Sequence, residues 1–343
     1  MIKKILVTGA NGYIGTVLTE KLFNQGQKVT GWDTDYFKEV TLGTHKNKYI
    51  SKKIDIRQKD IDLTNFDCII HLAALSNDPI GALNEKLTYE INHRASINLA
   101  KKAKKMGVKR FIFSSSCSVY GIAKNNIVTE ESTINPLTAY AKSKALVEED
   151  LKKLADDNFC VCLLRNATVY GFSPRFRNDL VVNNLITCGM ALGEIRILSD
   201  GTPWRPLIDI RDLCDIILKF INIDSKAVNG DIFNIGFNDG NLMVKEILNY
   251  VKKYLPDCQI KFTSEHGKDT RSYKVDFKKL KKLFPNIKQN WFLDKSIQHL
   301  IQQLNRFKFT KSDFDTKKFE RLTTLKVLMQ EQKLNKKLYW KSD

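Results

Sequence analysis

Val7-Thr8-Gly9-Ala10-Asn11-Gly12-Tyr13-Ile14-Gly15 is the stretch that decides the fold of this chain. It follows an apolar run over 4–8 that predicts a buried strand, and it precedes a helical pattern over 13–24. Glycines permit a tight turn there, let the backbone approach a pyrophosphate, and let the helix pack near the strand. The positive end of the helix would then face the phosphates. The order of strand, glycine-rich turn and helix predicts a dinucleotide site, although the spacing is GxxGxxG and not GxGxxG.

Short apolar runs continue to alternate with helical patterns through the first half of the chain. Strands are predicted at Lys4–Thr8, Lys28–Asp33, Cys68–Leu72, Arg110–Ser114 and Cys160–Arg165. Helices are predicted at Tyr13–Asn24, Asn84–Lys105 and Ala139–Ala155. This alternation predicts an α/β fold, a Rossmann-type doubly wound parallel sheet with helices on both faces.

Beyond about residue 171 the pattern loosens. We expect a NAD-binding Rossmann domain over 1–170, to which later segments return, and a smaller C-terminal substrate-binding lobe, mainly over 171–309. Residues 310–343 form a basic, helix-prone tail in which apolar residues recur at helical spacing: Leu322, Leu325, Leu328 and Met329. This spacing favours a helix that packs on the domain or on a partner subunit over one that lies on a membrane surface.

Composition narrows the function classes. The 343 residues are 43% hydrophobic, enough for a sizeable core, and no apolar run approaches the roughly 18 residues of a membrane span. The start of the chain does not resemble a secretory signal, and the seven cysteines include no CxxC pair, so we expect reduced thiols in a cytoplasmic protein. The net charge is +18, but the lysines are spread out and no zinc-finger or RNA-binding pattern accompanies them. We therefore expect neither a nucleic-acid partner nor a membrane.

Asp33 ends the second predicted strand, about 20 residues past the glycine turn, where a carboxylate accepts hydrogen bonds from ribose hydroxyls. It also repels a 2′-phosphate, and no arginine stands next to it in the sequence. Asp33 therefore favours NAD over NADP. Asp55 and Ile56 are candidates to cover the adenine, although Asp55 fits an ordinary turn aspartate nearly as well.

Tyr140 and Lys144 stand four residues apart in a predicted helix and therefore share a face. A free tyrosine, with a pKa of about 10, is a poor base at neutral pH. One positive charge about 5 Å away stabilises a phenolate by roughly 3 kcal/mol at an effective dielectric near 20. Lys144 and an oxidised nicotinamide ring are two such charges. Alone, the pair also fits an exposed helix face, but the upstream glycine turn favours redox catalysis.

A serine-rich run follows the predicted strand that starts at Arg110: Ser114-Ser115-Ser116-Cys117-Ser118-Val119-Tyr120-Gly121. The carboxyl end of a parallel strand is the ligand edge of the sheet. Ser116 or a neighbour is therefore a candidate to hydrogen-bond a sugar hydroxyl on whose proton Tyr140 acts.

With these residues in place, the chain resembles an extended short-chain dehydrogenase/reductase of the nucleotide-sugar epimerase/dehydratase family over about 3–300. The resemblance rests on TGANGYIG, HLAAL, FIFSSSCSVYG, YAKSK and DGTPWRPLIDIRD. It implies that Ser116 bonds the sugar, that Tyr140 is the acid/base and that Lys144 binds the nicotinamide ribose. The implied NAD-binding set is Gly9, Gly12, Tyr13, Ile14, Gly15, Asp33, Asp55, Ile56, Leu72, Ala73, Ala74, Asn92, Ser114, Tyr140 and Lys144. His71, before the two alanines, is expected to be a structural strand residue.

The same resemblance implies a nucleotide-diphosphate sugar as substrate. Arg205 and Arg271 match diphosphate arginines, whose planar fork meets phosphate oxygens in pairs. Asn184 falls where the family has a substrate-phosphate asparagine, and Trp204 either flanks the ligand or packs in the core. The implied substrate set is Ser116, Cys117, Ser118, Thr168, Asn184, Arg205 and Arg271. No metal site is predicted.

Departures from the family pattern refine the expectation. Dehydratases carry an Asp-Glu pair directly after the catalytic Ser/Thr, where this chain has Cys117 and Ser118, so 4,6-dehydration is disfavoured. Some 3,5-epimerases have a cysteine at the position of Ser118, which puts that chemistry in doubt as well. Thr168 replaces a common asparagine and His266 replaces an arginine, so no single substrate class matches fully.

The resulting expectation is an NAD-dependent nucleotide-sugar epimerase, most simply at C4. Tyr140 removes the hydroxyl proton, hydride moves to NAD, the keto sugar rotates, and hydride returns to the other face. A net dehydrogenase or reductase that gives or consumes a keto sugar stays open as an alternative. A non-catalytic NAD sensor is a third, against which the complete Ser116, Tyr140 and Lys144 set argues. The resemblance also implies a homodimer formed through the helices at 84–105 and 139–155.

Overall fold

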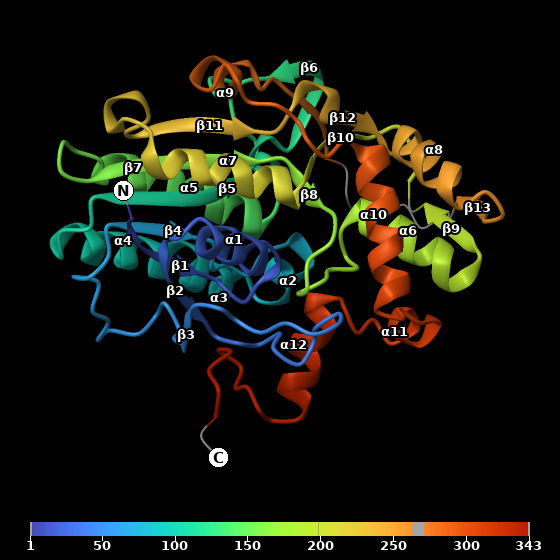
Figure 1. The fold of residues 1–343 in the computed structure, drawn as a ribbon, viewed down its shortest axis with the longest axis horizontal. Helices are drawn as coiled ribbons and strands as arrows, with labels where there is room; N and C mark the ends of the chain where they lie inside the picture. The colour runs from blue at the N-terminus through green and yellow to red at the C-terminus, as the bar shows by residue number, and fades with distance from the viewer. Residues whose placement is uncertain (1, 198, 263–270, 342–343) are drawn as a thin grey trace.

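A seven-stranded parallel sheet forms the centre of the structure, a computed structural model that describes residues 2–197, 199–262 and 271–341. The strand order is β11-β7-β5-β4-β1-β2-β3 (Figure 1). The strands are β1 (Lys4–Thr8), β2 (Lys28–Asp33), β3 (Ile50–Lys53), β4 (Cys68–His71), β5 (Arg110–Ser116), β7 (Cys160–Asn166) and β11 (Asp231–Ile235). The order runs outward in both directions from β1 and β4, which confirms the predicted doubly wound, Rossmann-type sheet.

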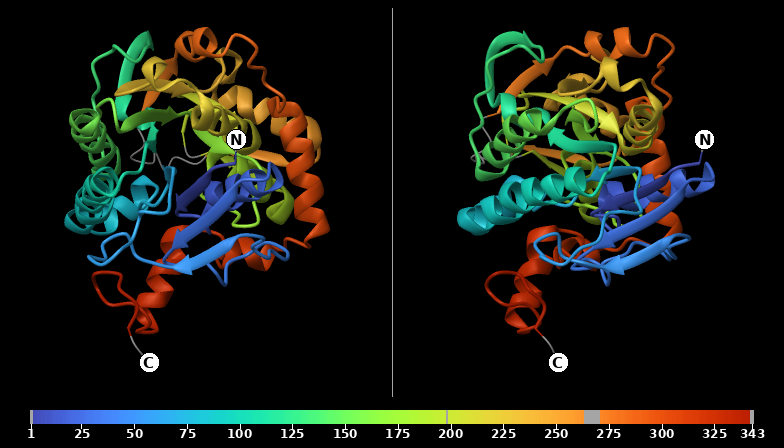
Figure 2. Two further views of the ribbon diagram at one scale, coloured as in Figure 1. Left: turned by 60° about the vertical axis from the view of Figure 1, so that its left-hand side comes forward. Right: turned by 90° about the vertical axis from the view of Figure 1, so that its left-hand side faces the viewer.

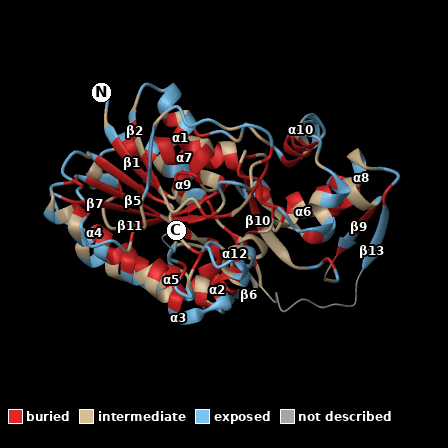
Figure 3. Cartoon of the chain, turned by 90° about the horizontal axis from the view of Figure 1, so that it is seen from below, coloured by how far each residue is buried: buried red, intermediate tan, exposed pale blue. Residues whose placement is uncertain are grey.

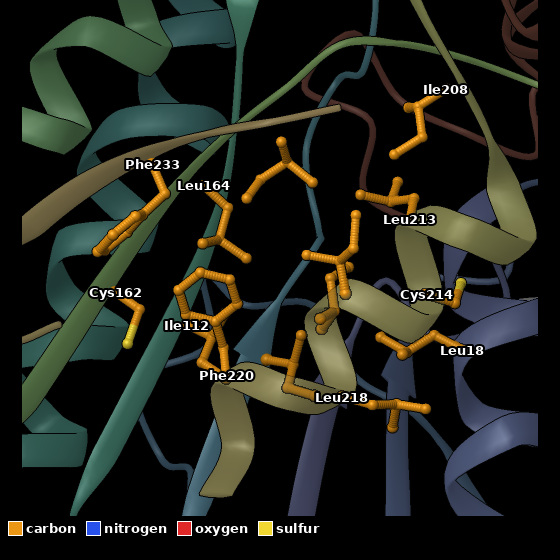
Figure 4. Close-up of a cluster of buried hydrophobic side chains, with 14 of the residues drawn as sticks. Leu18, Ile112, Cys162, Leu164, Ile208, Leu213, Cys214, Leu218, Phe220 and Phe233 are labelled. Atoms are coloured by element: carbon orange, nitrogen blue, oxygen red, sulfur yellow. The ribbon is translucent and has the colours of Figure 1, made fainter. Parts of the chain in front are cut away.

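Helices cover both faces of this sheet, and the alternation of side chains along β5 explains why. Ile112 packs with Phe220 and Leu18 on one face, shown in Figure 4, whereas Phe111 and Phe113 pack with helices on the other. The first face is covered by α1 (Tyr13–Asn24), α7 (Ile210–Asn222) and α9 (Lys278–Leu283). The second is covered by α3 (Glu85–Thr88), η1 (Tyr89–Ala95), α4 (Ser96–Lys105) and α5 (Ala139–Leu154). The inner strands of the sheet are accordingly buried, whereas the edge strand β3 and the outer helix surfaces are exposed (Figure 3).

A smaller lobe with its own core lies beyond one end of the sheet (Figure 1). Its elements are α6 (Val181–Leu192), β9 (Glu194–Ile197), α8 (Val244–Tyr254), β13 (Gln259–Phe262) and α10 (Leu293–Arg306). Short strands join it to the main sheet: β8 (Thr168–Tyr170) with β10 (Trp204–Asp209) and β12 (Asn241–Met243), and β6 (Ile122–Val128) with β14 (Ser272–Val275). The remaining short helices are α2 (Asp78–Leu83), η2 (Cys117–Tyr120), η3 (Ser225–Ala227) and η4 (Asn238–Gly240).

The C-terminal tail packs against its own chain. It contains α11 (Lys311–Asp315) and α12 (Arg321–Gln330) and ends in a bridge between Leu334 and Trp340. Leu325 is fully buried against Tyr36 and Ile80, and the other apolar residues of the predicted helix border the same cluster. The tail therefore packs on the domain, which is the first of the two positions expected for it. It lies below the sheet in Figure 2. No helix in the described parts of the chain is long and apolar enough to span a membrane.

Strand register brings the candidate residues to one edge of the sheet. Thr8 at the end of β1 lies beside Trp32 in β2 and His71 in β4. Farther along the sheet, Ser116 in β5 lies beside Asn166 in β7. The glycine turn, the end of β2, the end of β4 and the serine run therefore meet at the carboxyl edge, where this type of sheet binds ligands.

Candidate active site

The turn after β1 leaves space for a phosphate at the start of α1. Gly9 has a φ of 73°, and a Cβ on Gly15 would lie 2.1 Å from the Gly9 carbonyl oxygen. A Cβ on Gly9 would lie 2.8 Å from the backbone nitrogen of Ala73, so the backbone of Leu72 and Ala73 lies against the turn. Gly12 caps α1 without any side-chain bond, and the first turn holds no acidic residue. The unpaired N–H groups and positive helix end fit the diphosphate of a dinucleotide.

Asp33 is held at the end of β2 by backbone hydrogen bonds. Its carboxylate accepts from the amide nitrogen of Asn11 at 2.9 Å and from that of Asp35 at 2.9 Å. Burial raises the pKa of Asp33 to about 6 in spite of these bonds. The carboxylate is therefore mostly ionised at neutral pH, and it can accept hydrogen bonds from ribose hydroxyls.

Asp55 has the geometry of a turn aspartate. Its Oδ2 lies 2.5 Å from Nη2 of Arg57, and its Oδ1 accepts from the Arg57 amide at 2.9 Å. Ile56 beside it is buried. The carboxylate is thus committed to Arg57, and a role for Asp55 and Ile56 against the adenine stays a prediction.

Tyr140, Lys144 and Ser116 come together as predicted. The Thr138 side chain caps α5, which places Tyr140 and Lys144 in its first two turns. Lys144 Nζ donates to the Ser114 carbonyl at 2.6 Å and lies 5.8 Å from the centre of the Tyr140 ring. Ser116 is near enough to the Tyr140 hydroxyl to lower its pKa.

Burial favours the neutral forms of the Tyr140 and Lys144 side chains. It raises the pKa of Tyr140 to about 12, with a further increase from Asp78, while Ser116 lowers it. It lowers the pKa of Lys144 to about 7, which the carboxylate of Glu148 opposes. The chain alone therefore holds a neutral phenol, and the stabilisation expected from Lys144 is only partly available at pH 7. Arg177 and Arg271 also lower the pKa of Tyr140, and the positive charge of an oxidised nicotinamide would add to this stabilisation of the phenolate.

His71 and Asn92 connect these elements. His71 Nδ1 lies 2.6 Å from Thr8 Oγ1, and its Nε2 lies 2.7 Å from Ser96 Oγ. Burial lowers the pKa of His71 to about 3, so it is a neutral structural residue, as expected. The Asn92 side chain accepts from the Leu75 amide at 2.7 Å and donates to the Leu75 carbonyl at 3.1 Å. Asn92 therefore fixes the segment that follows β4.

The helix predicted over 84–105 is not regular in its middle. Residues Tyr89–Ala95 form the π-helical turn η1, which includes Asn92. A π turn holds one more residue than an α turn and occurs often at functional sites. The apolar spacing from which the helix was predicted does not indicate a π turn.

The edge of β5 and β7 presents unsatisfied polar atoms. In the described structure, Ser118 Oγ and Asn166 Oδ1 are buried without a hydrogen-bond partner. Asn166 also donates to Ser114 Oγ at 2.8 Å. A buried polar atom without a partner marks a place where a ligand can bond. The sequence analysis missed Asn166, although its position at the end of the strand beside β5 was a usable signal.

Cys117 corrects the predicted substrate set. Its thiol donates to the Arg165 carbonyl at 3.2 Å and lies in the hydrophobic core. Burial raises the pKa of this thiol. Its side chain is therefore turned away from the ligand edge, because the start of η2 rotates it inward.

The predicted diphosphate arginines are brought together by β10 and β14. Arg205 Nη1 donates to the Arg271 carbonyl, and Arg271 Nη1 lies 2.5 Å from Asp78 Oδ2. Lys274 Nζ lies 3.9 Å from the centre of the Trp204 ring, which is half-buried.

The other predicted substrate residues are placed less directly. Thr168 in β8 pairs with Leu207 in β10 and is half-buried. Asn184 donates from Nδ2 to the Asn178 carbonyl at 3.1 Å. His266 lies outside the described residues. Among the residues that are described, no group of three His, Cys, Asp or Glu side chains is placed to hold a metal ion.

Arg177 is a site residue that the sequence analysis did not identify. It is buried, pairs with Asp179 at 2.8 Å, and is near enough to Tyr13 and Tyr140 to lower the pKa of both. Its signal was the run 173–177, SPRFR, in which two arginines stand two positions apart, a few residues after the short strand β8. Asp78 was missed too, because nothing local distinguishes it from a helix-capping aspartate.

Comparison with known proteins gives one family. The sequence model described as the NAD dependent epimerase/dehydratase family matches residues 5–236. The UDP-glucose 4-epimerase of Bacillus subtilis is 26% identical over 311 residues, which cover 81% of this chain and 90% of the relative. The UDP-glucuronate 4-epimerase of Thermodesulfobacterium geofontis is 25% identical over 316 residues, which cover 87% and 94%.

Solved structures share the fold. An NAD-dependent NDP-hexosamine 5,6-dehydratase of tunicamycin biosynthesis matches with a TM-score of 0.79 at 20% identity, covering 89% of this chain and 98% of its own. A UDP-glucose 4-epimerase from Thermotoga maritima, solved with UDP-glucose, matches with a TM-score of 0.76 at 23% identity, covering 88% and 98%. At these identities the likeness establishes the fold, which epimerases and dehydratases have in common.

Proposed function

The chain belongs to the NAD-dependent epimerase/dehydratase family, and from this premise we propose that it is a nucleotide-sugar epimerase, most simply at C4. The observation that carries the proposal is the convergence of Ser116, Tyr140 and Lys144 beside the glycine turn, without a carboxylate in the two positions after Ser116. Relatives that are named 4-epimerases support it.

The residues present fit NAD. The turn of Gly9, Gly12 and Gly15 would hold the diphosphate, Asp33 the adenosine ribose and Lys144 the nicotinamide ribose. Bound NAD supplies hydride transfer with the sugar carbon.

The chain's own residues move the proton. Ser116 orients the sugar hydroxyl, and Tyr140 takes its proton as the carbonyl forms. Tyr140 gives the same proton back when the carbonyl is reduced on its other face. Because Tyr140 begins and ends each turnover as a phenolate, the scheme needs no further acid or base.

The smaller lobe would bind the nucleotide diphosphate. Arg205 and Arg271 lie side by side there, with the guanidinium of Arg271 directed at Asp78 on the catalytic side. A diphosphate that bonds Arg271 in place of Asp78 would connect the arginines of the smaller lobe with the catalytic residues, and the sugar would lie between them.

We further propose that the protein acts as a cytoplasmic homodimer. The seven cysteines are free and buried, which suits a reducing compartment. The α5 helix and the helices from α3 to α4 lie side by side on one face of the sheet, joined by His93 and Asp150 at 2.8 Å. Leu146 on α5 is 39% exposed, as expected for a residue that a second copy covers. Sedimentation of the wild type and of Leu146→Asp tests this, since a dimer formed here would dissociate in the variant.

The function is tested by incubating the purified protein with NAD and a panel of UDP-, GDP-, CDP- and dTDP-sugars. Products are followed by mass spectrometry and proton NMR, and NADH by absorbance. A new sugar of unchanged mass without net NADH supports epimerisation and identifies the carbon. Loss of two hydrogens with matching NADH would make the protein a dehydrogenase, and loss of water a dehydratase. Binding without turnover of any sugar would favour a sensor.

A further inference from the structure

The C-terminal tail is anchored on the residues that directly follow Asp33. Trp340 Nε1 donates to the Thr34 carbonyl at 2.6 Å, and the Tyr36 hydroxyl donates to the Leu338 carbonyl. The ring of Trp340 also lies 4.1 Å from Lys53 Nζ at the end of β3. The last part of the chain is therefore held against the strand ends where the adenosine half of a dinucleotide would lie.

Arg321, the first residue of α12, is buried beneath this tail. Its side chain is 2% exposed, its Nη2 donates to the Arg175 carbonyl at 2.7 Å, and its guanidinium carbon lies 4.2 Å from the centre of the Phe37 ring. Its Nη1 is buried and has no hydrogen-bond partner among the described residues. An arginine with an unused donor in the interior is unusual, because a buried charge is costly without an anion.

Arg175 is a second buried guanidinium without a carboxylate bonded to it in the described structure. It donates from Nε to the Asn11 carbonyl at 3.2 Å and from Nη1 to the Lys38 carbonyl at 2.8 Å. Burial, together with the neighbouring Arg177 and Arg175, lowers the pKa of Arg321 to about 9, although the carboxylates of Asp179 and Asp33 oppose this shift. Burial lowers the pKa of Arg175 as well. Arg165 differs, since its ion pair with Glu148 outweighs burial and raises its pKa.

The contacts of these arginines follow the path of a bound dinucleotide. Arg321 is near enough to Asp33 to lower the pKa of that carboxylate, and Arg175 bonds the glycine turn at Asn11. Arg177 lowers the pKa of Tyr13 at the start of α1 and that of Tyr140. Between the ribose at Asp33 and the nicotinamide at Tyr140, the anionic part of a dinucleotide is its diphosphate.

We propose that the C-terminal tail closes over bound NAD and that Arg321, together with Arg175, binds the cofactor's diphosphate beside the glycine turn. The inference rests on the cofactor site of the proposed function. An epimerase reuses the same NAD in each turnover, so a tail that slows cofactor release serves that reaction. The tail is thereby part of the cofactor site, although it lies outside the residues that the family model matches.

The test compares Arg321→Gln with the wild type and with Arg306→Gln, which removes an exposed arginine. Calorimetry on the NAD-free full-length protein measures the affinities of NAD, ADP, adenosine and adenosine 2′-phosphate. We expect NAD and ADP to bind about 10–100-fold more weakly to Arg321→Gln, the value of one charge-assisted hydrogen bond. Adenosine affinity should change less than about threefold, because adenosine carries no phosphate. Arg321→Lys should recover part of the loss, and NAD should dissociate faster from Arg321→Gln in stopped flow.

Two results would overturn the inference. If Arg321 only stabilises the tail, the Tm of the cofactor-free variant falls while its affinities for NAD and ADP stay at the wild-type value. If the loss is confined to adenosine 2′-phosphate, Arg321 recognises a 2′-phosphate and not the diphosphate. Asp33→Ala separates this inference from the proposed function. If NAD binds more weakly to Asp33→Ala but with wild-type affinity to Arg321→Gln, only the proposed role of the tail is wrong. If the wild type binds no NAD, both the role of the tail and the proposed function are wrong.

Discussion

Arg271 and Asp78 form an ion pair of 2.5 Å that joins the residue before β14 to the start of α2. The same carboxylate accepts from the Thr138 hydroxyl at the cap of α5, and it raises the pKa of Tyr140, which Arg271 lowers. Asp78 therefore holds Arg271, a predicted substrate-binding arginine, and opposes ionisation of Tyr140, the proposed catalytic phenol. Its effects on Arg271 and on Tyr140 are both testable.

The Asp78→Asn variant should bind the nucleotide sugar more tightly and should retain its activity to lower pH. The amide still accepts from Thr138, but it no longer neutralises Arg271 or repels a phenolate. We expect KM for the nucleotide sugar to fall several-fold. The limb of the pH–rate profile that reports Tyr140 should move to lower pH by about one pH unit. Asp62→Asn, at an exposed turn, is the control, and an unchanged profile in Asp78→Asn would contradict the assignment.

NAD affinity should depend on the protonation of Asp33. Its pKa in the free chain is raised to about 6 by burial, so the carboxylate takes up a proton as the pH falls through that value. The ionised form is the better acceptor for ribose hydroxyls. Affinity is therefore full above about pH 7 and falls below pH 6, approaching tenfold per pH unit. Calorimetry from pH 5 to 8 measures this, and Asp33→Asn should bind NAD weakly and should lack the fall in affinity below pH 6.

The sequence predicted five of the seven strands of the sheet, all except β3 and β11, and the shared helix face of Tyr140 and Lys144, because these features depend on local patterns. The helix predicted at 13–24 has the same limits in the structure, since Gly12 caps its start and the positive φ of Gly26 ends the turn after it. Tyr140 and Lys144 share a face because four residues make about one helical turn.

Other features depend on contacts between distant residues, and no local pattern indicates them. Arg321 lies 288 residues after Asp33 in the sequence, yet it is near enough in space to lower the pKa of Asp33. The sequence around Asp33, which contains no arginine next to it, therefore did not reveal this neighbour. The inward turn of Cys117 and the ion pair of Asp78 with Arg271 arise from packing in the same way.

Glu148→Gln should destabilise the fold. Glu148 accepts from Ser115 Oγ at 2.5 Å and pairs with Arg165 at 2.8 Å, and both charged side chains are 4% exposed. Loss of the carboxylate leaves the Arg165 charge buried and unpaired, which costs about 3–5 kcal/mol. Urea unfolding at pH 7 measures the change. The double variant Glu148→Met with Arg165→Met should recover much of the loss, because it removes both charges, and equal losses in the two variants would contradict this account.

Tyr140→Phe should abolish turnover while leaving the site formed. The variant removes the group that takes and returns the sugar's proton, a contribution typically worth about 10²–10⁴-fold in rate. The ring still packs against α2, where a Cβ on Gly81 would lie 3.2 Å from Tyr140 Cβ, so the fold has no reason to change. We expect kcat to fall by that factor while the affinities for NAD and the nucleotide sugar stay within about threefold. Tyr250→Phe, which alters a tyrosine that is 38% exposed, is the matched control. Full activity in Tyr140→Phe would rule out the acid/base role and require another proton acceptor at the edge of β5.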